Sequence, residues 1–255
     1  RVIEESRLDL TDPASEDALR MLVEGLVAEG KGARALERVD AALAKHPESA
    51  TFREIRGAVL ARTEHADEAR ADYEKALALD PKSARALSGL GALAVVAGDL
   101  PRALELFERA AQSSPDDVSA AYSAAQIVFA QGNQEEAMRR LREVLVRDPS
   151  HAGASNDLAW ILASKGQELE LALALAEQAQ RLSPKPDFAD TLGWVRLQRG
   201  EVDAAITAFE QAVAGKPKDP TLRYHLGLAL ARKGDRKRAL ETLHEALGSG
   251  TFPDA

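Results

Sequence analysis

Histidine, carboxylate and serine side chains could carry chemistry in this chain, but their spacing builds neither a catalytic nor a metal site. The five histidines are His46, His65, His151, His225 and His244, and no two of them are four residues apart as a helical zinc-binding pair requires. The absence of cysteine excludes disulfides, thiolate zinc ligands and a cysteine nucleophile. We therefore expect no enzyme activity, no catalytic residues and no bound metal.

One glycine-rich string matches a dinucleotide-binding fingerprint by its letters alone. SGLGALA, residues 88–94, contains the pattern G-x-G-x-x-A. The fingerprint works only between a strand and a helix of a βαβ unit, and the flanking residues here favour helices. No P-loop and no nucleophile-elbow motif is present in the sequence. We expect no cofactor.

Composition limits both the fold and the partners. Alanine, leucine, glutamate and arginine dominate, and aromatic residues make up only 4% of the 255 residues, which favours helices over a β-sandwich. The net charge is −8, and no basic stripe suggests a nucleic-acid partner. No apolar run approaches the roughly 18 residues of a membrane span.

Regularly spaced prolines reveal the elements that must position any site. Five are 34 residues apart and two follow at spacings of 35 and 33: Pro13, Pro47, Pro81, Pro115, Pro149, Pro184 and Pro217. Proline blocks the continuation of a helix and biases the preceding residue away from helical geometry. Each proline therefore marks the end of one repeat.

Two further columns keep the same phase. A column of small residues consists of Val23, Gly57, Gly91, Ala125, Ala159, Gly193 and Gly227. A second column, after the same apolar run, consists of Gly30, Glu64, Gly98, Gly132, Gly166, Gly200 and Gly234. The first fits a helix that a partner helix approaches closely, and the second fits a left-handed helix C-terminus. The columns predict about fourteen helices in seven pairs, with a further helix over residues 1–11.

LGWVRLQRGEVDAAITAFEQAVAGKP (192–217) and LGALAVVAGDLPRALELFERAAQSSP (90–115) resemble the tetratricopeptide repeat (TPR). The resemblance implies an all-α fold, a TPR α-solenoid of about seven helix-turn-helix repeats forming a right-handed superhelix. Residues 1–15 would be the end of a preceding repeat, and 16–255 a single solenoid. Its expected repeats are 16–49, 50–83, 84–117, 118–151, 152–186, 187–219 and 220–253.

Three positions depart from the TPR pattern. Arg56 replaces the usual leucine, Glu64 replaces the turn glycine, and Ala176 replaces the large apolar residue of the second helix. Each substitution is expected to weaken packing locally without changing the fold.

The resemblance also implies that the first helix of each repeat lines a concave groove. The groove positions carried over residue by residue predict these partner-binding residues: Tyr122, Gln126, Phe129, Asn156, Asp157, Trp160, Asp190, Trp194, Tyr224 and His225. Aromatic anchors flanked by amides and carboxylates suit a buried contact with a peptide. In the alternative interpretation, Trp160 and Trp194 fill space between successive helices, because Trp194 directly follows a small glycine.

The leading functional prediction is a non-catalytic scaffold that binds a segment of a partner protein in this groove. Aromatic rings near carboxylates and amides also suit sugars, so the alternative is a carbohydrate-binding component of an exopolysaccharide secretion machine. Pure spacing or oligomerisation is a third option. Asp157, Asp187 and Asp190 suggest a ligand with basic or hydroxyl-rich features.

The last three repeats carry a further resemblance. SNDLAWILASKG, DTLGWVRLQRG and LRYHLGLALARKGD, within residues 152–255, are similar to the C-terminal part of bacterial envelope TPR proteins that accompany exopolysaccharide production and PEP-CTERM/exosortase sorting. This resemblance implies a bacterial envelope assembly with a periplasmic or envelope-associated location. A cytoplasmic location is the alternative. Because RVIEESRLDL at the start resembles the middle of a helix, we expect the chain to be a piece of a longer protein.

Overall fold

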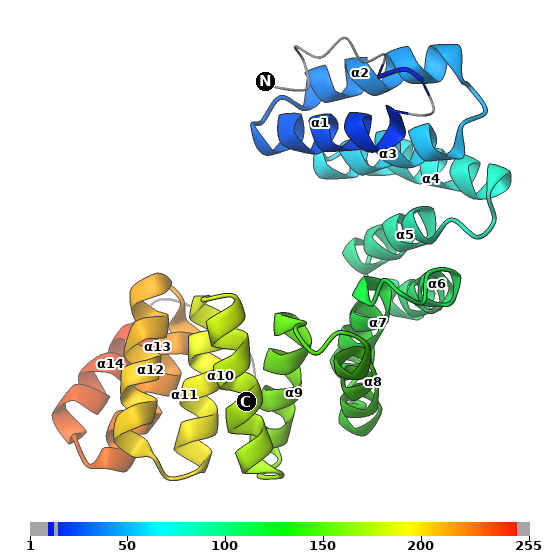
Figure 1. The fold of residues 1–255 in the computed structure, drawn as a ribbon. Coiled ribbons are helices and arrows are strands. Elements are labelled where there is room, and N and C mark those ends of the chain that lie inside the picture. The colour runs from blue at the N-terminus through cyan, green and yellow to red at the C-terminus, as the bar shows by residue number, and fades with distance from the viewer. Residues whose placement is uncertain (1–9, 13–14, 249–255) are drawn as a thin grey trace. The chain divides into compact units, whose positions relative to one another are not determined.

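The structure, a computed structural model, describes residues 10–12 and 15–248. These residues form fourteen α-helices and no strand (Figure 1). The helices are α1 (Glu16–Ala28), α2 (Gly32–Lys45), α3 (Ala50–Arg62), α4 (Ala66–Leu79), α5 (Ala84–Val96), α6 (Leu100–Ser113), α7 (Ser119–Ala130), α8 (Gln134–Arg147), α9 (Ala152–Ser164), α10 (Leu169–Leu182), α11 (Pro186–Gln198), α12 (Val202–Gly215), α13 (Pro220–Lys233) and α14 (Arg236–Gly248).

The predicted all-α fold and the fourteen helices are confirmed. The further helix expected over residues 1–11 lies mostly outside the described residues, and Leu10 and Thr11 are in a turn. Among the helices that the structure describes, none combines the length and the hydropathy needed to cross a membrane.

The chain divides into two compact units, Arg1–Gln131 and Gly132–Ala255, called unit 1 and unit 2. The division lies inside the expected fourth repeat, so unit 1 contains α1 to α7 and unit 2 contains α8 to α14. Within each unit every helix packs on the next, as α11 does on α12 (Figure 1). The odd-numbered helices, called A helices, also contact one another: α1, α3 and α5 in unit 1, and α9, α11 and α13 in unit 2. Each unit thus presents a face made of A helices.

The glycine in the middle of α11 lets the two helices of its repeat touch. A Cβ atom on Gly193 would lie 2.7 Å from Cδ1 of Phe209 on α12, closer than any real side chain tolerates. The same relation, with the partner 16 residues later, recurs in three other repeats: Gly57–Tyr73, Gly91–Phe107 and Gly227–Leu243. The predicted role of the small column is confirmed at its four glycines, since a large residue of the second helix occupies the space that each glycine leaves.

Two departures from the repeat pattern have a structural explanation. Arg56 replaces packing with ion pairing, because its Nη1 lies 2.7 Å from Oδ2 of buried Asp72 and its Nε 2.7 Å from Oδ1 of Asp40. Ala176 belongs to a repeat whose small-column residue, Ala159, carries a side chain, and both alanines are fully buried. A smaller residue on α10 thus accompanies a larger one on α9.

The third departure keeps the backbone of the residue it replaces. The six glycines of the turn column all have φ between +65° and +89°, and Glu64 has φ 65° in the same column. The expected left-handed turn is therefore confirmed at every position of the column. An L-residue adopts this conformation at a cost of roughly 1–2 kcal/mol, so Glu64 is strained.

Candidate functional site

The ten predicted groove residues all lie on A helices, but they are divided between the two units. Tyr122, Gln126 and Phe129 lie on α7 of unit 1. The other seven lie on α9, α11 and α13 of unit 2: Asn156, Asp157, Trp160, Asp190, Trp194, Tyr224 and His225. Because α9 contacts α11 and α11 contacts α13, the site is built from these seven.

The two tryptophans lie against each other. The ring centroids of Trp160 on α9 and Trp194 on α11 are 5.5 Å apart, with 31° between the ring planes. The two residues are 34 positions apart, so they occupy one helix position in consecutive repeats, and this places them side by side. Both side chains are partly exposed, and Trp194 also packs against a buried cluster that includes Leu197 and Leu226. Trp194 therefore contributes to the core while part of it remains on the surface.

His225 on α13 lies at the centre of the aromatic cluster. Its ring centroid is 5.2 Å from that of Trp194, 5.8 Å from that of Trp160 and 5.8 Å from that of Phe209. The ring centroid of Tyr224 lies 6.0 Å from that of His225. Only 8% of His225 is exposed, so this predicted groove residue is a buried hub behind the tryptophans.

A buried carboxylate holds the imidazole. Nδ1 of His225 lies 2.9 Å from both carboxylate oxygens of Asp190, which is 7% exposed, and this contact joins α11 to α13. Burial raises the pKa of Asp190, and the contact with His225 opposes that rise. The sequence predicted both residues as site residues without predicting that they pair. The available signal was their spacing of 35 residues, one repeat plus one position.

Two polar atoms near the rings are buried without a hydrogen-bond partner among the described residues. They are Nε1 of Trp194, a donor, and Oδ1 of Asn156, an acceptor. The Nδ2 group of Asn156 donates to Oδ1 of Asp157 at 3.2 Å. A buried polar atom left unsatisfied costs about 1–3 kcal/mol, so both atoms favour a conformation or a complex that supplies partners.

The carboxylates that suggested a basic ligand are partly neutralised within the chain. Asp187 accepts hydrogen bonds from Nζ of Lys216 at 2.6 and 2.8 Å, and Asp190 is engaged by His225. The case for a site therefore rests on the aromatic rings and the unsatisfied polar atoms more than on negative charge.

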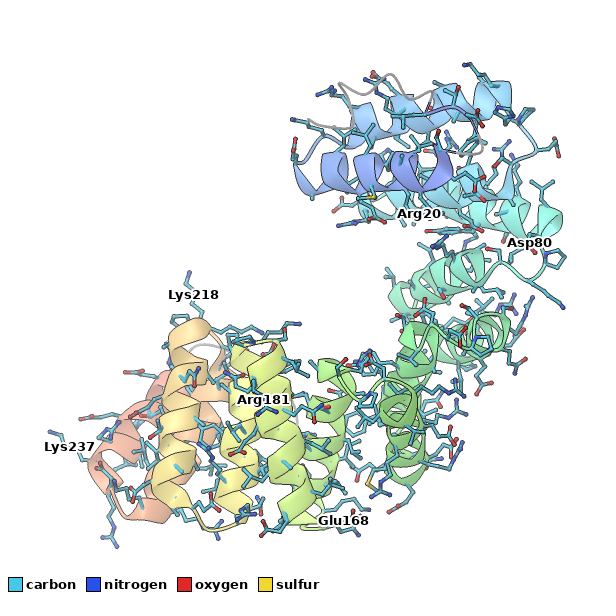
Figure 2. All side chains as sticks on the ribbon, in the orientation of Figure 1. Arg20, Asp80, Glu168, Arg181, Lys218 and Lys237 are labelled. Carbon is cyan, nitrogen blue, oxygen red and sulfur yellow. The ribbon has the colours of Figure 1, made fainter. Side chains whose placement is uncertain are left out.

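The A-helix face of unit 1 has a different chemistry. Arg20 on α1 (labelled in Figure 2) has Nη2 3.9 Å from Oε2 of Glu54 on α3. Glu54 is 8% exposed and accepts a hydrogen bond from the hydroxyl of Ser83, and its burial raises its pKa. Further along, Nε2 of Gln126 donates to the hydroxyl of Tyr122 at 2.8 Å. Phe129 of the predicted set is 37% exposed.

Clusters of side chains that could bind a metal ion are absent from the described residues. No group of three or more histidine, aspartate or glutamate side chains there is arranged to hold a metal ion. Asp72 with Arg53 and Arg56 forms an ion-pair network between α3 and α4.

Repeat length, paired helices, the glycine–aromatic contacts and the left-handed turns together define a tetratricopeptide repeat array. Profiles of the tetratricopeptide repeat match residues 20–84, 60–118, 94–155 and 191–255. The chain belongs to the tetratricopeptide repeat family. No curated protein matched the sequence.

Solved structures share the fold at low sequence identity. The Cut9–Hcn1 hetero-tetramer of the APC/C matches with a TM-score of 0.72 and 19% identity over 94% of this chain, which spans 44% of the matched chain. Pseudomonas aeruginosa PilF matches with a TM-score of 0.71 and 18% identity, over 79% of this chain and 92% of that one. A tetratricopeptide repeat protein from Parabacteroides merdae matches with a TM-score of 0.63 and 17% identity, over 93% and 94%. These likenesses concern the fold alone.

Proposed function

We propose that this protein is a non-catalytic scaffold and that the A-helix face of unit 2 binds a segment of a partner protein. The tetratricopeptide repeat fold is typical of protein–protein interaction. The observation that carries the proposal is the pair of partly exposed tryptophans, Trp160 and Trp194, in contact at 5.5 Å on neighbouring A helices.

The rings suit binding because the protein already holds them in place. Trp194 is fixed by the core beneath it, and both tryptophans contact buried His225. Aromatic side chains with little freedom left to lose provide large contact areas at a small entropic cost. An apolar side chain of a partner that covers their exposed parts would gain from burial without ordering them first.

The two unsatisfied polar atoms, Nε1 of Trp194 and Oδ1 of Asn156, could orient a bound segment through hydrogen bonds. A main-chain amide of a bound segment has one acceptor for Nε1 of Trp194 and one donor for Oδ1 of Asn156. Both atoms are covered in the free protein, so the side chains that cover them must change rotamer on binding while the indole rings stay in place. A peptide satisfies both atoms through its backbone and covers the rings with its side chains.

The experiment is a paired measurement on Trp160→Ala and Trp194→Ala, with Met21→Ala as control. Met21 lies on an A helix of unit 1 and is 65% exposed. Photocrosslinking from position 160 in the full-length protein would identify the partner segment, whose affinity is then measured with purified components. We expect each tryptophan variant to lose about 2–4 kcal/mol of binding free energy with helicity retained, and the control to lose none.

A loss of stability without a loss of affinity would show that the two tryptophans serve core packing only. If the rings serve only the core, each tryptophan variant loses roughly 3–5 kcal/mol of stability, as core aromatic deletions do, while the folded fraction binds with unchanged affinity. That result would overturn the proposal. Tryptophan emission that responds to acidic or neutral oligosaccharides and to no peptide would favour the carbohydrate alternative.

The proposal includes a bacterial cell envelope as the setting, with the protein periplasmic or envelope-associated. Its support is the resemblance of residues 152–255 to envelope TPR proteins that accompany exopolysaccharide production. Fractionation of cells that express the full-length protein tests this part separately. Recovery in the periplasmic or envelope fraction is expected, and recovery in the cytosol alone would contradict it.

A further inference from the structure

The Asp190–His225 pair is a buried titratable element beneath the proposed binding surface. His225 contacts rings from four helices: Trp160 of α9, Trp194 of α11, Phe209 of α12 and its neighbour Tyr224 of α13. The pair has little contact with water, since the two residues are 8% and 7% exposed. Partner binding as proposed above uses the indole rings and leaves this pair a separate role.

The other charged groups around the pair are carboxylates and the cations that pair with them. Asp187 of α11 is paired with Lys216, and Asp219 lies at the start of α13. Asp157 on α9 contacts Asn156. On the same helix as His225, Arg223 is paired with Glu245 of α14, and α12 contributes the uncharged ring of Phe209. Histidine is the one side chain here whose ordinary titration range spans the interval between about pH 5 and pH 8.

The proton content of the pair decides its net charge. With a neutral imidazole that donates Nδ1–H to Asp190, the pair carries one buried negative charge. One further proton makes the pair neutral overall, whichever of the two side chains holds it, because coupled groups titrate as a unit. Burying a net charge is costly, whereas an imidazolium against the faces of Trp160 and Trp194 gains a cation–π attraction.

We propose that the aromatic face of unit 2 is a proton-controlled binding surface, held in its binding geometry when the Asp190–His225 pair carries the additional proton and loosened when the pair loses it. The coupling is physical, because the imidazole that changes charge touches both tryptophans and joins α13 to α11. Because this proton control regulates the proposed binding surface, the inference rests on the proposed function. Its first test requires no partner.

The sign of the effect on stability follows from proton binding. The proposal implies that the folded pair binds its additional proton more readily than the separated side chains of the unfolded chain, because burial disfavours the net negative charge that the pair otherwise carries. Between the unfolded and folded titration ranges the native state then holds more protons than the unfolded state. Stability therefore decreases as pH rises through this window.

Tryptophan emission of the whole chain, followed from pH 5 to pH 8 without a partner, is the direct test. Both tryptophans of the sequence contact His225, so the signal is local to the pair. We expect a single transition in the wild type, its loss in His225→Gln, and its retention in the control His244→Gln, where the histidine is exposed on α14. A wild type with no transition, or a transition that survives in a helical His225→Gln variant, would overturn the proposal.

An NMR titration of the histidine rings of the wild type keeps the test decisive if His225→Gln fails to fold. A pH-dependent change of the His225 ring signals within the same range, which reports proton uptake by the pair, supports the proposal, and its absence overturns it. Once a partner segment is known, its affinity should be about fivefold or more higher at pH 6 than at pH 8, a size typical of coupled sites. Equal affinities at both pH values would reject the control of binding, whereas the absence of any peptide ligand would reject only the proposed function.

Discussion

Glu54 in unit 1 and Asp190 in unit 2 occupy the same position of their A helices, since 136 residues, or four repeats of 34, separate them. Both are buried, with 8% and 7% exposed, and burial raises the pKa of both. Their partners differ. Glu54 accepts from the Ser83 hydroxyl and lies 3.9 Å from Arg20, whereas Asp190 contacts His225 at 2.9 Å.

The comparison shows that the repeat fixes where a carboxylate is buried, while adjacent repeats determine what that carboxylate can do. Arginine stays charged at every working pH, so the environment of Glu54 has a constant cation. Histidine changes charge near neutrality, so the environment of Asp190 varies. The two units also differ in their aromatic residues, because the contact between Trp160 and Trp194 lies in unit 2.

The largest expected effect tests whether the aromatic cluster distinguishes unit 2. Phe209→Ala removes a fully buried ring that faces Gly193 and contacts His225, and should cost about 3–5 kcal/mol of stability. Phe107→Ala in unit 1 removes the equivalent ring against Gly91 at a comparable cost. Urea unfolding followed by circular dichroism measures both.

Native tryptophan emission separates these two variants. Only Phe209→Ala should change it, because both tryptophans contact the imidazole that Phe209 supports. An equal change in Phe107→Ala would show that unit 2 is not an independent aromatic unit.

The next effect tests whether ion pairing distinguishes unit 1. Asp72, whose side chain is 3% exposed, accepts from Arg53 at 3.0 Å and from Arg56 at 2.7 Å. Asp72→Asn leaves both arginines without their shared carboxylate and should cost about 1–3 kcal/mol, below the value for a fully buried pair because the arginines are partly exposed. Asp40→Asn is the control, since Asp40 also pairs with Arg56 but is 52% exposed and should contribute less than about 1 kcal/mol. Equal losses in urea unfolding would mean that burial of Asp72 is unimportant.

A smaller effect concerns the pH dependence of unit 1. Burial raises the pKa of Glu54, so the folded state binds a proton more readily than the unfolded state. Stability from this group is therefore present below the ordinary carboxyl range and is lost as pH rises through the raised pKa. Glu54→Gln should remove this decline, which urea midpoints between pH 4 and pH 7 would reveal. A Glu54→Gln variant with the same pH slope as the wild type would contradict the assignment.

The repeat architecture could be predicted from the sequence because it depends on local chemistry repeated many times. Prolines, turn glycines and the small column each impose one backbone or packing requirement, and the structure shows the turn at every position of its column. The contact of Trp160 with Trp194 was predictable for the same reason, since equal positions in consecutive repeats stack.

The side-chain chemistry of the site was only partly predictable. Asp190 and His225 were identified as site residues, but their pairing depends on the rotation of α13 against α11, which the repeat spacing does not specify. Likewise, Lys216 lies outside the A helices, so counting groove positions could not show that it neutralises Asp187. Whether the ten predicted residues bind a partner stays a prediction.

The smallest expected effect compares two strained turns, one in each unit. Glu64 has φ 65° where six repeats have glycine, and Glu168, which precedes α10 (labelled in Figure 2), has φ 43°. Glu64→Gly should stabilise unit 1 by about 0.5–1 kcal/mol, because relief of left-handed strain exceeds the greater entropy that glycine gives the unfolded chain. Glu168→Gly should gain less, since it also removes the hydrogen bond that Arg142 donates at 2.6 Å. Urea unfolding of the two variants in parallel measures the difference. A larger gain at Glu168 would mean that its contact with Arg142 contributes nothing and that the strain is greater in unit 2.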